Sequence, residues 1–154
     1  MEIRVRLPRV ADEEGCVALA SLAMEPAAAK PFVAAHFREH RMIVAEADGA
    51  IVGILAWRTD WFGCAFVSLV YVREEFRRRG VAREMFLSVE TLTRSPRVFS
   101  STEEDNTAAI RMHAALGFRP SGHVDNLPQG KRELLFFKRV PPRAAPPEDA
   151  VAEN

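Results

Sequence analysis

Apolar and polar positions alternate along several short stretches of this chain, and this alternation predicts β-strands. Ile3, Val5 and Leu7 are separated by charged residues, which is typical of a half-buried strand ending at Pro8. The run FVSLVYV at residues 66–72 is almost continuously apolar, as in a central strand buried on both faces. Further strands are predicted at residues 42–46, 51–57, 97–101, 118–123 and 133–139, with turns at 48–49 and 60–63.

Helical periodicity predicts helices between these strands. Asp12 is suited to cap the first helix, which Pro26 interrupts or ends. Asn106 or Asp105 is suited to cap the last one, and Gly117 follows its end. The other predicted helices cover residues 28–39 and 81–92. In the first of these, Phe32, Ala35 and Phe37 are expected to face inward, and His36 is a further candidate for that face.

The order of the predicted elements is β-α-α-β-β-β-α-β-α-β-β, which implies an α/β protein. Hairpins around βαβ units favour a mixed sheet with helices on both faces. The length fits one folded domain, which we place at residues 1–140. Residues 141–154 hold four of the ten prolines and no aromatic residue, so we expect a disordered tail there.

The composition is that of an ordinary globular domain and argues against several classes of function. Lys and Arg number 21, as do Asp and Glu, and a zero net charge argues against a dedicated nucleic-acid-binding protein. No apolar run is long enough to cross a membrane, and the N-terminus lacks the apolar stretch of a signal peptide. Cys16 and Cys64 have neither disulfide-framework nor zinc spacing, so we expect reduced thiols, no metal site and a cytoplasmic location, with no membrane partner.

The stretch from Val70 to Ala82 contains the first candidate site. An apolar strand leads into the arginine-rich turn RRRG at residues 77–80, and a helix follows. The free N–H groups of a first helical turn favour a phosphate, and small residues there allow the backbone to approach it. Neighbouring arginines add charge, so the pattern predicts a pyrophosphate-binding site. Taken alone, the same pattern also fits a solvated surface turn.

A second candidate stretch, residues 106–118, begins 26 positions after Gly80 (106 − 80). Asn106, Ile110 and His113 fall at i, i+4 and i+7, so they share one helix face, while a neighbouring face is apolar. One face is therefore expected to pack, and the other to offer an amide and an imidazole to a ligand.

Together these two stretches resemble the signatures of the GCN5-related N-acetyltransferase (GNAT) superfamily. Residues 77–82 match its Q/R-x-x-G-x-G/A acyl-CoA motif, and residues 106–118 match N-x-x-A-I-x-L-Y-x-x-x-G-F. Residues 121–127 and 133–138 look like a poorly characterised bacterial branch of the superfamily. The resemblance implies a GNAT-like fold, with a mixed sheet of about seven strands flanked by about four helices.

The resemblance also implies acetyl-CoA as the acyl donor and assigns roles to residues of both stretches. The main chain of Val70, Tyr71 and Val72 is expected to pair with the pantetheine arm, and Asn106 to hydrogen-bond it. The pyrophosphate is expected on the amides of Arg77, Arg78, Arg79, Gly80, Val81 and Ala82.

Two positions depart from the family pattern. His113 stands where the family commonly has a tyrosine that protonates the leaving thiolate; a histidine can donate a proton near neutral pH, but its ring has a shorter reach. The alternative is a packed core histidine, with water protonating the thiolate. Ser68 stands where relatives often carry a carboxylate that acts as the general base. Glu103, Glu104 and Asp105 could serve as that base, but their position fits charge pairing at a helix terminus equally well. The identity of the general base therefore stays open.

Other candidate groups have simpler interpretations. His36 and His40 have i, i+4 spacing that can bind a metal, but no third ligand accompanies them, and a solvated helix face is preferred. Trp57, Trp61 and Phe62 either line an acceptor pocket or pack in the core and hairpin.

The sequence thus predicts an N-acetyltransferase that moves an acetyl group from acetyl-CoA directly to a primary amine of a small molecule or peptide. Direct transfer is expected because no cysteine lies in either motif stretch. A catalytically weak acyl-CoA-binding sensor or subunit is the alternative, favoured by Ser68 and His113. Relatives are often homodimers, but the sequence leaves the oligomeric state and the acceptor open.

Overall fold

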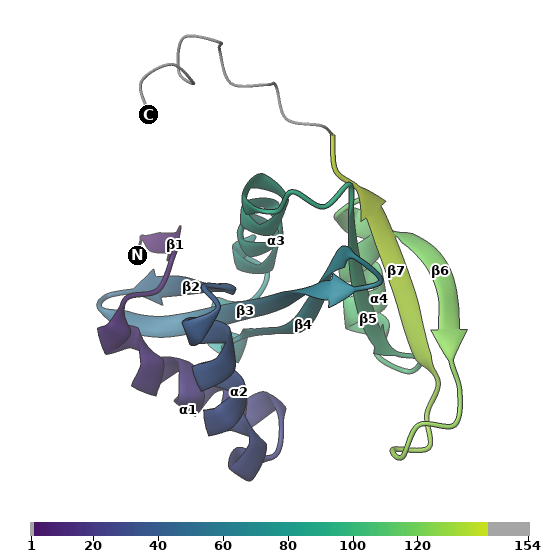
Figure 1. The fold of residues 1–154 in the computed structure, drawn as a ribbon. Coiled ribbons are helices and arrows are strands. Elements are labelled where there is room, and N and C mark those ends of the chain that lie inside the picture. Colours follow the sequence, from purple (N-terminus) through teal and green to yellow (C-terminus); the bar gives the residue numbers. More distant parts are fainter. Residues whose placement is uncertain (1, 142–154) are drawn as a thin grey trace, which may run out of the picture.

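The computed structural model describes residues 2–141, which build a seven-stranded mixed sheet with helices on both faces (Figure 1). The strand order is β1-β2-β3-β4-β5-β7-β6, and only β4 and β5 pair in parallel. The strands are β1 (Ile3–Arg6), β2 (Met42–Ala47), β3 (Ala50–Trp61), β4 (Cys64–Val72), β5 (Arg97–Glu103), β6 (Arg119–Val124) and β7 (Glu133–Arg139). The helices are α1 (Glu13–Ala23), α2 (Pro26–Arg38), α3 (Val81–Leu92) and α4 (Thr107–Ala115), with 3-10 turns at Val10–Asp12 and Glu74–Phe76.

The predicted α/β class, with seven strands and four helices, is confirmed. The predicted helix at residues 81–92 has the bounds that its periodicity indicated. The predicted tail, residues 141–154, lies outside the described residues except for Pro141. Within residues 2–141, none of the helices has the length and apolar character that a membrane span requires.

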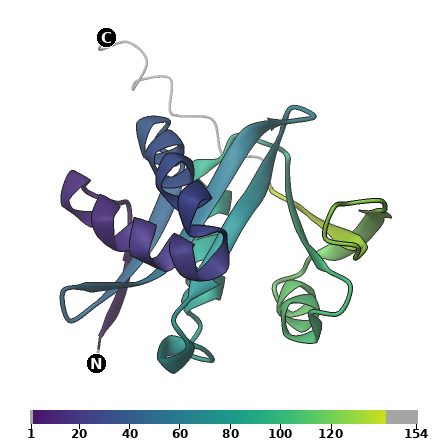
Figure 2. The same cartoon turned by 90° about the horizontal axis from the view of Figure 1, so that it is seen from below.

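Two apolar clusters lie on opposite faces of the sheet. On one face, Leu19 of α1 and Val33 of α2 pack against Ile54 of β3. On the other face, Met85 of α3 packs with Leu55, the next residue of β3, because successive strand residues point to opposite faces. All five side chains are fully buried. Figures 1 and 2 show this arrangement, with α1 and α2 together on one side of the sheet and α3 on the other.

Phe32 and Phe37 of α2 face inward as predicted, since both are partly buried and pack against the core cluster on that side of the sheet. The fully buried residues of the helix are Ala29 and Val33, which the sequence pattern did not single out. The helix begins at Pro26, two residues earlier than expected, because proline is well tolerated in the first helical turn.

The first predicted hairpin turn is confirmed, and the second is shorter than expected. Asp48 and Gly49 both have positive φ, 50° and 80°, as a two-residue turn of this type requires. Strand β3 continues past residue 57 to Trp61, and only Phe62 and Gly63, again with positive φ, turn the chain. Residues 60–61, expected in a turn, are therefore strand.

Strand β4 is central in the sheet, but the expected burial on both faces is wrong. Residues 68–71 are only partly buried, while Ala65, Val67 and Val72 are buried. The reason is that β5 covers the edge of β4 over a short length only, as described below.

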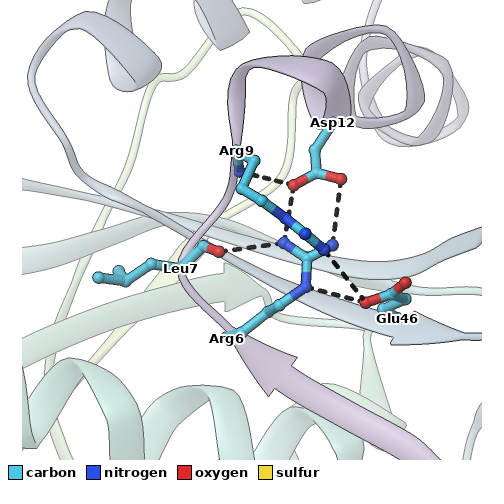
Figure 3. Close-up of polar contacts among 5 residues, drawn as sticks. All are labelled: Arg6, Leu7, Arg9, Asp12 and Glu46. Atoms are coloured by element: carbon cyan, nitrogen blue, oxygen red, sulfur yellow. Dashed lines mark hydrogen bonds and ion pairs between the residues drawn. The ribbon is translucent and has the colours of Figure 1, made fainter. Parts of the chain in front are cut away.

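Arg6 ties the first strand to the loop that leads into α1 (Figure 3). Its guanidinium donates to both carboxylate oxygens of Asp12, at 2.7 and 3.1 Å, and to Glu46 of β2 at 2.9 Å. Asp12 also accepts the backbone N–H of Arg9 at 2.6 Å. Asp12 thus occupies the N-cap position of α1 as predicted, but its carboxylate makes no cap hydrogen bond to that helix, because Arg6 and Arg9 engage it.

We expect replacement of Asp12 by Asn to destabilise the fold near neutral pH by about 2 kcal/mol, because a charge-assisted bidentate contact is lost. The hydrogen bond from Arg6 lowers the pKa of Asp12 below its ordinary value of 3.8. Its contribution is therefore present above that value and is lost as the pH falls through the lower, folded-state pKa.

The measurement is the free energy of unfolding in urea at neutral pH and below pH 4. The parent should lose the contribution of Asp12 on acidification, and Asp12→Asn should show a smaller loss. Equal stability of the two proteins at neutral pH would contradict this assignment.

Candidate active site

The parallel strands β4 and β5 pair with each other at only two positions, Ala65 with Val98 and Phe66 with Phe99. Beyond these pairs β4 continues to Val72 and β5 to Glu103, each paired only with its other neighbour. We call this divergence the fork, formed by residues 67–72 of β4 and 100–103 of β5. Its facing edges leave main-chain N–H and C=O groups outside the sheet ladder, so that an extended ligand can pair with them.

An aromatic cluster holds the closed end of the fork. The ring centroid of Trp61 lies 5.1 Å from that of Phe66 and 4.8 Å from that of Phe99, so the β3–β4 hairpin is packed against β5. Trp57 is 4% exposed and belongs to the core, whereas Phe62 is 88% exposed. Trp57 therefore packs in the core, and Trp61 packs on the aromatic residues of the hairpin and of β5.

A β-bulge lies where the fork opens. On β3, Ala56 pairs with Leu69 and the next residue, Trp57, pairs with Val67, so Ser68 has no partner on β3. A bulge bends its strand and redirects side chains. It explains why Val67 and Val70, three positions apart, both pack on the α3 side of the sheet, while Leu69 packs on the opposite side.

The arginine-rich turn follows the open end of β4 and leads into α3. Gly80 is the N-cap residue of α3 and has a left-handed backbone, with φ of 78°. A Cβ built at Gly80 would meet no protein atom within 4 Å, so the space beside this main chain is open. The first N–H groups of α3 are thus presented beside a glycine, as an anion-binding helix terminus requires.

The arginine side chains have different roles in this turn. Arg77 Nε donates to the carbonyl oxygen of Val72 at 2.8 Å, and its guanidinium lies 5.4 Å from the ring centroid of Tyr71. Arg79 lies 5.6 Å from the ring centroid of Phe76. Arg77 therefore fixes the turn to the last residue of β4, and this contact joins the predicted residues Val70, Tyr71, Val72, Arg77, Arg78, Arg79, Gly80, Val81 and Ala82 into one continuous region.

Asn106 caps α4, as predicted. Its side-chain oxygen accepts the backbone N–H of Ala109 at 3.1 Å, which orients the side chain at the helix N-terminus. Because β4 and β5 are parallel, the segments that follow them leave the sheet at the same end, so Asn106 and the arginine-rich turn lie at the open end of the fork.

His113 is packed in the core at 1% exposure. Nδ1 lies 2.7 Å from the carbonyl oxygen of Ala109, and Nε2 lies 2.8 Å from Ser100 Oγ of β5. The ring stacks on Phe136, with centroids 4.6 Å apart, and contacts Phe118 edge-on. Both ring nitrogens thus have hydrogen-bond partners within the protein. This is the packed core histidine that the sequence offered as the alternative to a proton donor.

The acidic residues that follow β5 are engaged by a lysine. Lys131, from the β6–β7 connection, lies 2.8 Å from Asp105 and 3.4 Å from Glu103. Its hydrogen bond lowers the pKa of Asp105. Glu103 and Asp105 are therefore charge-paired with a lysine, a partner that the sequence did not indicate.

The sequence analysis missed one polar pair. His36 is partly buried, which agrees with its candidacy for the inward face rather than with a solvated helix face, and its Nε2 lies 3.5 Å from Ser68 Oγ. The serine interrupts an otherwise apolar strand, and this interruption was the available signal.

A sequence model of the acetyltransferase (GNAT) family matches residues 12–118. The chain belongs to this family. The fold expected from the resemblance is therefore confirmed together with the family.

A solved GNAT acetyltransferase from Bacillus cereus ATCC 10987 is 27% identical, covers 90% of this chain and 98% of its own, and has a TM-score of 0.84. The protein yncA from Salmonella typhimurium, solved with its cofactor acetyl-CoA, is 17% identical with a TM-score of 0.75, over 96% of this chain and 99% of its own. Aminoglycoside N(6')-acetyltransferase type 1 from Salmonella typhimurium is 32% identical over 92 residues, or 53% of this chain. The match spans 63% of that relative's length.

The burial of His113 predicts a pH-dependent stability of this GNAT domain. Burial lowers the pKa of His113 below its ordinary value of 6.5, so the unfolded chain binds a proton there more readily than the folded one. The stability that His113 contributes is therefore present above pH 6.5 and is lost as the pH falls through the folded-state pKa, by at most about 1.4 kcal/mol per pH unit.

We expect His113→Gln to be less stable than the parent at about pH 7.5, and to lose less stability between about pH 7.5 and 5.5. Urea unfolding at both pH values measures this difference. The exposed His40 provides the control, since His40→Asn should keep the slope of the parent. Parallel slopes for the parent and His113→Gln would contradict the prediction.

Proposed function

We propose that this protein transfers an acetyl group from acetyl-CoA to a primary amine. The observation that carries the proposal is the fork, where two parallel strands diverge beside a helix N-terminus that a glycine leaves open. Membership of the GNAT family and the aminoglycoside acetyltransferase relative support it.

In this proposal the main chain holds the cofactor. The pantetheine arm lies along β4 at Val70, Tyr71 and Val72, like an added strand, and Asn106 hydrogen-bonds it from across the fork. The amides of the turn from Arg77 to Ala82, including Arg78, Arg79, Gly80 and Val81, hold the pyrophosphate. Main-chain N–H groups released from pairing at the Ser68 bulge and beyond stabilise the developing oxyanion of the thioester.

Transfer is direct in this proposal. Cys64 lies opposite Trp61 at the closed end of the hairpin, at the other end of β4 from the arginine-rich turn. The departing thiolate takes its proton from water, because both nitrogens of His113 are already hydrogen-bonded within the protein. His113 then positions α4 and Asn106 by joining that helix to β5.

The acceptor is a primary amine on a small molecule or peptide. An aminoglycoside is one member of this class, suggested by the relative that matches 53% of this chain. A cytoplasmic location is part of the proposal, since acetyl-CoA is supplied there, and the homodimer stays a prediction.

Acetyl-CoA should raise the melting temperature, because a ligand that binds only the folded state stabilises it by mass action. Release of free CoA thiol should then be measured with kanamycin, spermidine, free lysine and a peptide with an unblocked N-terminus. Turnover with one of these amines is the expected result. A thermal shift without turnover of any amine would support the acyl-CoA-binding sensor, and no thermal shift at millimolar acetyl-CoA would contradict the whole proposal.

Replacement of Gly80 by Val should weaken acetyl-CoA binding by about tenfold or more, whereas Arg78→Ala should weaken it only slightly. The β-branched side chain would occupy the open space beside the amides and disturb several of them together. Calorimetry measures the affinity, and circular dichroism confirms that the variants are folded.

Gly49→Val is the matched control for backbone strain. Gly49 has φ of 80°, close to the 78° of Gly80, and a Cβ there would also meet no protein atom within 4 Å. It lies in the β2–β3 turn, outside the fork. Both variants strain a left-handed residue, so weaker binding in Gly80→Val alone would locate the cofactor at this turn. Similar affinities for the two variants would contradict that location.

A further inference from the structure

The side chain of His36 has a defined orientation and a defined tautomer. Its Nδ1 lies 2.8 Å from the carbonyl oxygen of Phe32, one turn earlier in α2. A carbonyl oxygen only accepts hydrogen bonds, so Nδ1 carries a proton, and in the neutral ring Nε2 then carries the lone pair. The ring of Phe32, with its centroid 4.2 Å from that of His36, packs against the imidazole. The helix thus presents a proton-accepting nitrogen in a fixed direction.

That nitrogen points at the start of the fork. Nε2 lies 3.5 Å from Ser68 Oγ, and Ser68 is the bulged residue of β4. A contact of 3.5 Å is long for a hydrogen bond, so the serine hydroxyl only weakly satisfies the lone pair. Catalytic hydrogen bonds are often long before the substrate is bound, and a second donor can approach this nitrogen.

Three other titratable side chains near the fork are engaged within the protein. Asp105 and Glu103 are paired with Lys131, and the nitrogens of His113 are both bonded inside the core. Among residues 2–141, His36 takes part in no ion pair, and the partners of its ring nitrogens, Phe32 and Ser68, are uncharged. His36 is therefore an imidazole whose partners are uncharged and whose Nε2 faces the fork.

We propose that His36 is the general base of the acetyl transfer, and that Ser68 positions its imidazole. The inference rests on the proposed function. Nε2 takes one proton from the acceptor ammonium, and the resulting amine attacks the carbonyl carbon of the acetyl thioester. The new C–N bond forms as the C–S bond breaks, and the electron pair leaves with the CoA sulfur. The nitrogen loses a second proton to water and the thiolate gains one from water, so that the products are an amide, CoA thiol and protonated His36.

The test compares the parent, His36→Ala and His36→Gln in the thiol-release assay, with the amine of the four-member panel that the parent acetylates fastest. We expect kcat to fall by about 10²–10⁴-fold in both variants, as loss of a general base predicts. The KM for acetyl-CoA and the thermal shift that it causes should stay unchanged, which also shows that the variants are folded. Added imidazole should restore part of the turnover of His36→Ala, because a merely structural histidine is not replaced by free imidazole.

His40→Asn is the matched control, because His40 is an exposed histidine four positions later whose left-handed backbone, with φ of 57°, asparagine tolerates. It should retain the kcat of the parent. An independent readout is the side-chain ¹⁵N spectrum of the parent, in which His36, assigned by its absence from His36→Gln, should show the Nδ1–H tautomer. The Nε2–H tautomer would overturn the inference.

The two proposals fail in different ways. If the parent acetylates an amine and His36→Ala and His36→Gln do so at a similar rate, the base is elsewhere and the proposed function stands. A reduced kcat that imidazole does not restore would likewise overturn the role of His36 as base. If the parent binds acetyl-CoA but acetylates none of the amines, the proposed function fails and this inference fails with it.

Discussion

The arrangement of this protein depends on a parallel strand pair that is held together at one end only. Two residue pairs join β4 to β5, and they connect the β1–β4 part of the sheet to the β5–β7–β6 part. Trp61, Phe66 and Phe99 pack against one another over this junction, and these aromatic contacts add to the two residue pairs that hold it. Continued pairing would satisfy the strand edges within the protein and leave no main chain for a cofactor.

The open end of the fork keeps its shape because β4 and β5 are each held by their own side-chain contacts. Arg77 bonds the carbonyl oxygen of Val72 and so fixes the turn that follows β4. On the other arm, His113 joins α4 to β5 through Ser100 and stacks on Phe136 of β7. His113, which stands where the family commonly has a tyrosine, therefore has a structural role here: it holds α4, and with it Asn106, against β5.

Local signals in the sequence predicted much of the fold, and the features it could not predict are long-range ones. The helix at residues 81–92, the Asn106 cap and the turn at Asp48 and Gly49 each follow from residues close together in the chain. The Ser68 bulge depends on register against β3, and the half-burial of β4 depends on where β5 diverges. Likewise, i, i+4 spacing predicted His36 and His40 on one helix face, but α2 ends at Arg38 and His40 lies beyond it, and only tertiary packing directs His36 toward Ser68.

The difference between the features that the sequence predicts and those that it does not has a physical basis in the way the site is built. In the proposed function, main-chain groups bind the cofactor, and such binding constrains the backbone only at the few positions, such as Gly80, where the backbone is unusual. Proton transfer needs only a side chain within reach, and several elements around the fork can supply one. The acyl-CoA motif can consequently be recognised in this sequence, although residues 68 and 113 depart from the family pattern. The proposed base lies on α2 rather than on β4, which is consistent with a site where the backbone shape is constrained but the element that supplies the base can differ from the family pattern.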